Sequence, residues 1–145
     1  MSIPQSGGGP IESFAQLAEF MESGSKSKDL WKIGTEHEKF GWLTDTRRPL
    51  PYAGERSISA IFQGLADRHG WEPVREGDNV IGLNRGAANI SLEPGGQFEL
   101  SGAPFASVNE TEAELRQHLD EVAGIAGPLG IRFMGIGAAP EWGHA

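Results

Sequence analysis

Four glutamates lie in two short segments whose spacing could build a metal site. Glu93 and Glu99 flank Gln97 in segment 89–101, where polar residues fall on odd positions and apolar residues on even ones. Because side chains alternate across a strand, this pattern predicts one long strand with an apolar face and a polar face that the three residues share. Segment 94–96, Pro-Gly-Gly, interrupts the run and indicates a bulge or kink beside a bound group.

Glu36 and Glu38 form a second pair, and in a strand they would share a face about 7 Å apart. If both segments lie in one sheet, four carboxylates could meet over one patch. Crowded anions repel one another, and a protein retains them mainly when a cation neutralises them. Ligation by oxygen alone favours Mg²⁺ or Mn²⁺ over Zn²⁺. The alternative is a solvated polar face, which is the commoner role of a glutamate on a strand.

Other short motifs give weaker signals. His37-Glu38 begins like the HExxH zinc helix, but Gly41 stands where the second histidine would be. The glycines of segment 135–140 lack the third glycine of a dinucleotide-binding loop, and the chain contains no GxxxxGK[ST] phosphate loop. Arg47 and Arg48 could contact phosphate, although adjacent arginines in a loop are usually exposed to solvent.

Composition excludes several classes of protein. The 145 residues carry a net charge of −8 without a basic stripe, so a nucleic-acid partner is not expected. No apolar run has the length of a membrane span, and the N-terminus resembles neither a signal nor a transit peptide, so we expect a cytoplasmic protein. Cysteine is absent, which excludes disulfides, thiolate zinc sites and a cysteine nucleophile within this chain.

The elements that would position these residues can be read from periodicity. Residues 1–10 read as a mobile tail and residues 11–145 as one domain. Short hairpin connections indicate an α+β class, with an antiparallel sheet and helices on one face. The expected helices cover 11–21, 58–70 after an N-cap at Ser57, and a third from Asn109 or Thr111 with Leu115, Leu119, Val122 and Ile125 on its apolar side; the expected strands cover 31–42, 71–75, 80–83, a long run from Asn89, and 131–136.

Several runs of the sequence resemble one enzyme family. Segment 32–41, KIGTEHEKFG, resembles the first signature of the plant-type glutamate–cysteine ligases, a family shared with many proteobacteria. Segment 90–104, ISLEPGGQFELSGAP, resembles its most specific run. Shorter matches occur at 71–72, 76–78, 81–83 and 130–137, followed by Pro140 and Trp142. The resemblance covers nearly everything after the tail, and runs of this length rarely arise by chance.

The resemblance implies an activity and a site. Members of this family use ATP to phosphorylate the γ-carboxylate of L-glutamate, and the amine of L-cysteine then displaces phosphate in the first step of glutathione synthesis. Their fold is similar to glutamine synthetase, with an antiparallel sheet forming a funnel lined by metal-binding carboxylates. By this likeness Glu36, Glu38, Glu93 and Glu99 are the catalytic metal ligands for Mg²⁺ or Mn²⁺, and Gln97 is a hydrogen-bonding residue for substrate or metal-bound water.

Two departures from the family keep alternatives open. Family enzymes are considerably longer, so the chain reads as an N-terminal portion that we expect to be inactive alone. Redox disulfides of plant members have no counterpart here, because cysteine is absent. The alternatives are a ligase that joins a γ-glutamyl group to another amine, and a truncated non-catalytic module that binds metal weakly or pairs with a full-length subunit. No motif decides the oligomeric state.

Overall fold

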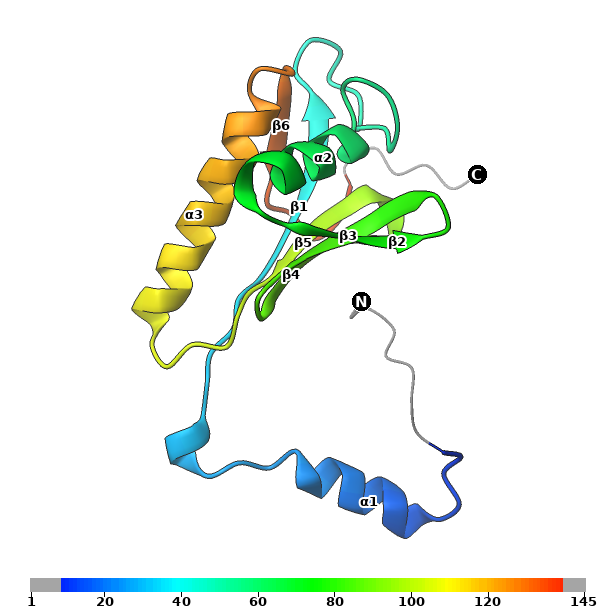
Figure 1. Cartoon of the computed structure of the whole chain (residues 1–145), viewed down its shortest axis with the longest axis vertical. Helices are drawn as coiled ribbons and strands as arrows, with labels where there is room; N and C mark the ends of the chain where they lie inside the picture. Colours follow the sequence, from blue (N-terminus) through cyan, green and yellow to red (C-terminus); the bar gives the residue numbers. More distant parts are fainter. Residues whose placement is uncertain (1–8, 140–145) are drawn as a thin grey trace.

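Six strands form one antiparallel sheet in the order β2-β3-β4-β5-β1-β6. The computed structural model describes residues 9–139, so most of the predicted tail, as well as Pro140 and Trp142, lies outside the described residues. Helices α2 and α3 both lie on the same side of the sheet (Figure 1). This arrangement confirms the predicted α+β class. The strands are β1 Glu36–Leu43, β2 Glu72–Glu76, β3 Asn79–Arg85, β4 Ala88–Glu93, β5 Gln97–Ser101 and β6 Ile131–Met134.

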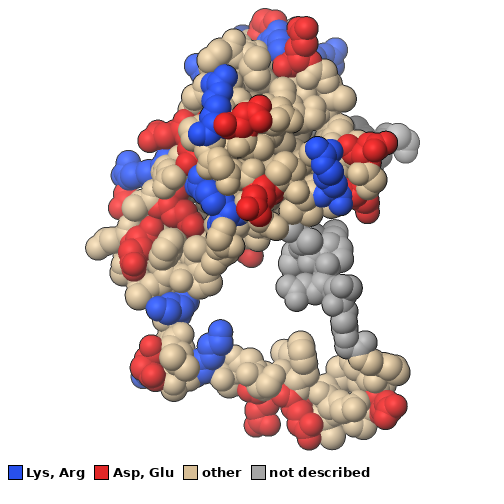
Figure 2. Space-filling view, viewed as in Figure 1, with Lys and Arg blue, Asp and Glu red and all other residues tan. Residues whose placement is uncertain are grey.

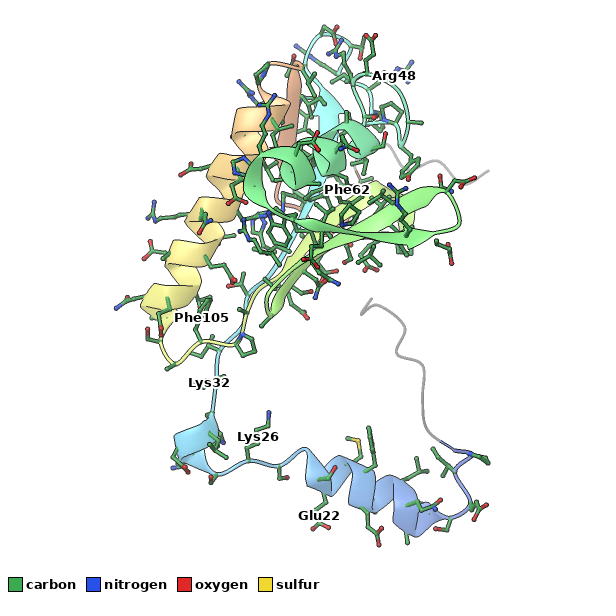
Figure 3. All side chains as sticks on the ribbon, in the orientation of Figure 1. Glu22, Lys26, Lys32, Arg48, Phe62 and Phe105 are labelled. Carbon is green, nitrogen blue, oxygen red and sulfur yellow. The ribbon has the colours of Figure 1, made fainter. Side chains whose placement is uncertain are left out.

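Helix α2 (Ile58–His69) supplies much of the core. Its ring of Phe62 stacks on Phe98 of β5 at a centroid distance of 5.4 Å, and the two side chains are fully buried between helix and sheet (Figure 3). Burying a side chain of this size contributes about 1.5–3 kcal/mol. The hydroxyl of Ser57 accepts a hydrogen bond from the Ala60 N–H, and Gly70 ends the helix in the left-handed conformation. The predicted bounds of this helix are therefore confirmed.

Helix α3 (Val108–Ala126) begins one residue before the earlier of its two predicted starts, and Val122, Ile125 and Leu115 of its predicted apolar side pack in or against the core. Ser107 and Glu110 form a reciprocal capping box that fixes its start. The expectation that Leu119 lies on the buried side was wrong, because 40% of its surface is exposed. His118 and Glu121 are buried instead. Each has a polar partner inside the fold, which offsets the cost of burial.

The long strand predicted from residue 89 is in fact two strands, β4 and β5, joined by the short 3-10 turn η2 (Pro94–Gly96). The two strands pair antiparallel, with Glu93 opposite Gln97. Gly95 and Gly96 have φ angles of 80° and 82°, which glycine adopts without a steric penalty. The prediction of a kink was therefore wrong because the chain reverses at this point.

The strand predicted at 31–42 also begins later, at Glu36. The 3-10 turn η1 (Lys28–Leu30) precedes the predicted range, and the first part of that range contains an isolated bridge between Ile33 and Phe105. The strand predicted at 131–136 ends at Met134, which is the last residue of β6 that pairs with β1. These differences leave the pairing of β1 with β5 intact, and that pairing positions the glutamates.

Helix α1 (Phe14–Ser23), predicted at 11–21, has no buried residue. It stands apart from the sheet, to which it is joined by an extended segment that carries Lys26 and Lys32 (Figures 1 and 3). Acidic and basic groups are intermixed over the body on the face that Figure 2 shows, without a basic stripe there. Across residues 9–139, no helix is both long enough and apolar enough to span a membrane.

Candidate functional site: a carboxylate face on the central strands

The predicted glutamates share one face of three neighbouring strands. Strand β5 lies between β4 and β1, and Glu99 is directly opposite Glu38 on β1 and Ser91 on β4. Cβ atoms of directly opposed residues lie about 4.5–5.5 Å apart. Glu36 pairs with Ser101 and Glu93 with Gln97, so all five predicted residues fall on the same face. The opposite face carries Phe98 and Leu100, which are buried beneath the helices.

Serine hydroxyls orient two of the carboxylates. The hydroxyl of Ser91 donates to Oε1 of Glu93 at 3.0 Å, and that of Ser101 donates to Oε1 of Glu99 at 3.2 Å. Glu99 is buried, with 7% of its surface exposed, whereas Glu36 and Glu38 are exposed. The alternation of residues 89–101 places both serines on the polar face, but serine is so common on polar faces that the pattern alone assigned them no role.

A buried lysine lies behind this face on the helix side of β1. The Nζ atom of Lys39 is 2.7 Å from Nε2 of His118 on α3 and 3.4 Å from Nδ1 of His37. Its ammonium also lies 5.0 Å from the centre of the Phe98 ring. Burial lowers the pKa of Lys39 to about 7, and the charge of Glu99 opposes this effect only in part. Sequence analysis missed this residue because lysine is almost never fully buried.

The two histidines follow the same electrostatic logic. Burial, together with the charge of the neighbouring Lys39, lowers the pKa of His118 to about 2. Burial and Lys39 also lower the pKa of His37. By the alternation of side chains along β1, His37 lies on the helix side, away from the face that carries Glu36 and Glu38.

The carboxylates are neighbours but do not yet form a closed ligand cluster. Within residues 9–139, no three acidic or histidine side chains converge closely enough to hold a metal ion. The donor set nevertheless fits a hard cation, because carboxylate oxygens are the ligands that Mg²⁺ and Mn²⁺ prefer. The pairing of β1, β5 and β4 places Glu38 and Glu99 directly side by side, whereas Glu36 and Glu93 lie toward opposite ends of the face.

Comparison with known proteins identifies the family. The sequence pattern of "Glutamate-cysteine ligase family 2" matches residues 32–145, which include all four glutamates and Gln97. This chain belongs to the glutamate–cysteine ligase family 2. Two similar relatives are the chloroplastic glutamate–cysteine ligases of Medicago truncatula, 51% identical over 126 residues, and of Arabidopsis thaliana, 50% identical over 126 residues.

These matches cover 87% of this chain but 24% of each of those two relatives. The chloroplastic glutamate–cysteine ligase B of Oryza sativa subsp. japonica is 50% identical over 142 residues, which is 92% of this chain and 28% of the relative. The chain thus spans about a quarter of the length of the curated relatives it matches. The family resemblance seen in segments 32–41 and 90–104 is confirmed.

Proposed function

We propose that this chain contributes the metal-binding carboxylate face of an ATP-dependent glutamate–cysteine ligase, with L-glutamate, L-cysteine and ATP as substrates. The observation that carries the proposal is the direct cross-strand pairing of Glu38 with Glu99 in a member of this family. Two carboxylates held side by side repel each other in the absence of a cation. A ligase that handles ATP and a carboxylate substrate needs divalent cations at such a place.

The proposed reaction has two steps. The γ-phosphoryl group of ATP passes to an oxygen of the glutamate γ-carboxylate, and ADP is released. The amine of cysteine then attacks the acyl carbon, so that a C–N bond forms and phosphate leaves. Both steps bring anions together, so positioning and charge neutralisation dominate catalysis. Mg²⁺ or Mn²⁺ would supply that positive charge.

The residues of this chain have distinct proposed roles. Glu36, Glu38, Glu93 and Glu99 hold the cations, and Gln97 donates or accepts a hydrogen bond to substrate or to metal-bound water. Glu99 lies at the centre of the face, between β4 and β1, which supports the proposal that it would hold a cation. The hydrogen bonds from Ser91 and Ser101 would restrict the rotamers of their glutamate partners.

Family membership and the fraction of the relatives that this chain spans lead to proposals about the whole enzyme's fold and the activity of this chain alone. We expect a fold like glutamine synthetase for the whole enzyme, and no ligase turnover from these 145 residues alone, because they span a quarter of the relatives. A cytoplasmic location remains a prediction, and the relatives named above are chloroplastic proteins. Neither nucleic acid nor a membrane is part of the proposal.

The test is the affinity of the chain for Mn²⁺, measured by electron paramagnetic resonance and calorimetry. Glu99→Gln and Glu38→Gln should each weaken binding at least about 10-fold, because each removes a charged ligand. Glu72→Gln, on the edge strand β2, is the matched control and should leave the affinity unchanged. Equal affinity in all four proteins would refute the metal assignment.

A second experiment tests the activity. A chimera would carry this chain in place of the matching quarter of the Arabidopsis thaliana relative, and ADP release would be followed with L-glutamate, L-cysteine and MgATP. We expect turnover that Glu99→Gln abolishes and Glu72→Gln retains. A folded chimera that turns over equally well with Glu99→Gln would overturn the role proposed for this face.

A further inference from the structure

An apolar pocket opens beside the carboxylate face. Its cavity has a volume of about 370 Å³ and lies against the second half of β1, the loop that follows it, and the η2 turn. This loop carries Arg48 in Figure 3. Ligand pockets of small molecules begin at about this volume. The lining consists of Phe40, Gly41, Trp42, Thr44, Arg47, Pro49, Leu50, Gly95, Gly96, Met134, Ile136 and Ala139.

The pocket is continuous with the proposed metal site along two strands. Phe40 follows Glu38 by two residues on the same face of β1, a step of about 7 Å. On the neighbouring hairpin, Gly95 and Gly96 follow Glu93. A molecule in the pocket would therefore lie next to the carboxylate face, two residues along β1 from Glu38.

Arg47 gives this pocket its cation. It is the one non-glycine residue with a positive φ, 57°, among residues 9–139. A hydrogen bond from its N–H to the Leu43 carbonyl, 2.8 Å long, closes the turn that holds it there. Backbone strain of this kind concentrates at functional sites. Its guanidinium forms no ion pair with any residue of 9–139, whereas the nearby Arg56 is paired with Asp45.

We propose that this pocket binds the acceptor amino acid, with a small apolar side chain against Phe40, Trp42 and Leu50 and its α-carboxylate on Arg47. This inference rests on the proposed ligase function. The pocket is complementary to such a ligand. Its mostly apolar lining suits the side chain, and its one cation, with no carboxylate in the lining, suits the α-carboxylate. The free amine then points toward the carboxylate face, where the γ-glutamyl phosphate forms.

Two other occupants fit less well. The nucleobase of ATP is separated from the γ-phosphorus by a ribose and two further phosphates, so it belongs farther from the carboxylates than this pocket. The donor glutamate brings an α-ammonium group, for which the lining residues offer no anionic partner. An acceptor amine needs no such partner, because its nitrogen must stay free to react.

The bond-forming step balances in this arrangement. The neutral acceptor amine attacks the γ-acyl carbon; a C–N bond forms, and the C–O bond to phosphate breaks. Phosphate leaves with the bonding electron pair and takes up the proton that the amine loses. The pocket supplies position rather than acid–base chemistry, which is consistent with its apolar lining.

The test uses nuclear magnetic resonance of the ¹⁵N-labelled chain with Mg²⁺ present. The probe is L-2-aminobutyrate, which has the size of cysteine but does not chelate metal through a thiol. We expect a saturable shift of the Trp42 indole signal, assigned with Trp42→Phe. n-Propylamine, which lacks the carboxylate, should bind at least about fivefold more weakly. Arg47→Gln should weaken aminobutyrate binding to the same extent, and Arg75→Gln on β2 should not.

The outcomes separate this inference from the proposed function. Mn²⁺ binding that depends on Glu99, together with no response of Trp42 or with equal binding of aminobutyrate and propylamine, would overturn the pocket assignment alone. An Mn²⁺ affinity that Glu99→Gln and Glu38→Gln leave unchanged would overturn the proposed function. The ¹⁵N spectrum of Arg47→Gln also reports whether the fold is retained, and a retained fold with unchanged aminobutyrate affinity would exclude Arg47 as the carboxylate partner.

Discussion

Replacing Lys39 should remove a specific pH dependence of stability. The side chain is 1% exposed, and its amine contacts His118 on α3. In the unfolded chain the lysine keeps its proton up to its ordinary pKa of 10.5, whereas burial brings the pKa of the folded chain to about 7. Between these values the unfolded chain binds one more proton, so the free energy of unfolding rises with pH.

The expected slope is about 1.4 kcal/mol per pH unit, or about 2 kcal/mol between pH 7.5 and 9. Below pH 7 the lysine is protonated in both the folded and the unfolded chain, so Lys39 gives the free energy of unfolding no slope with pH there. The assay is urea unfolding followed by tryptophan fluorescence at three pH values in this window. Lys39→Met should give a flat dependence, while Lys32→Met, at an exposed position, should keep the slope.

The slope is the quantity to compare, because Lys39→Met also leaves Nε2 of His118 without its partner and lowers stability at every pH. Equal slopes in the wild type and in Lys39→Met would refute the claim that this amine loses its proton inside the fold. A free energy of unfolding that decreases from pH 7.5 to 9 in the wild type would refute it as well.

Four further predictions concern stability measured by urea unfolding. Ser107→Ala should cost about 1 kcal/mol, because it removes the capping box of α3. Glu121→Ala should cost about 3–5 kcal/mol, because it leaves Arg85, 2.8 Å away, without its buried partner. Gly64→Ala should cost about 1–3 kcal/mol, because the new Cβ would lie 2.7 Å from a methyl group of Ile125. Gly124→Ala, with no atom within 4 Å of the new Cβ, should stabilise α3 by up to about 1 kcal/mol.

Each of these predictions has a contrary result. A loss in Ser107→Ala that Ser107→Thr does not restore would show that the hydroxyl is not the cap. For Glu121, a cost below 1 kcal/mol would mean that the ion pair with Arg85 is not formed in solution. For the glycines, equal effects of alanine at 64 and 124 would contradict the close packing of α2 against α3.

The fold could be predicted from sequence where local signals and tertiary packing agree. Helix α2 has an N-cap at Ser57, a glycine at 70 and apolar residues at helical spacing, and its bounds match. The shared face of Glu93, Gln97 and Glu99 also followed from alternation, because the pairing of β4 with β5 preserves it. The sequence could only suggest that the strand of Glu38 lies in the same sheet; the structure shows β1 paired with β5 and Glu38 opposite Glu99.

Other features depend on partners that are distant in the sequence. A kink and a reversal at Pro94–Gly96 have the same local signature, and the choice is decided by strand pairing. Nothing in the sequence indicated that His118 and Glu121 are buried, because their partners lie 79 and 36 residues away in the chain. The pocket could not be predicted from the sequence for the same reason, because Arg47 and Gly95 are distant in the chain and line one cavity only in the folded structure.

The hairpin between β4 and β5 limits how this part of the gene can vary. Its paired residues, such as Glu93 with Gln97, always have numbers of the same parity. Sliding β5 by one residue along β4 would break that parity and would direct Glu99 into the core and Phe98 into water. A residue inserted into or deleted from this connection should therefore be tolerated only where the loop absorbs it and the pairing register stays unchanged.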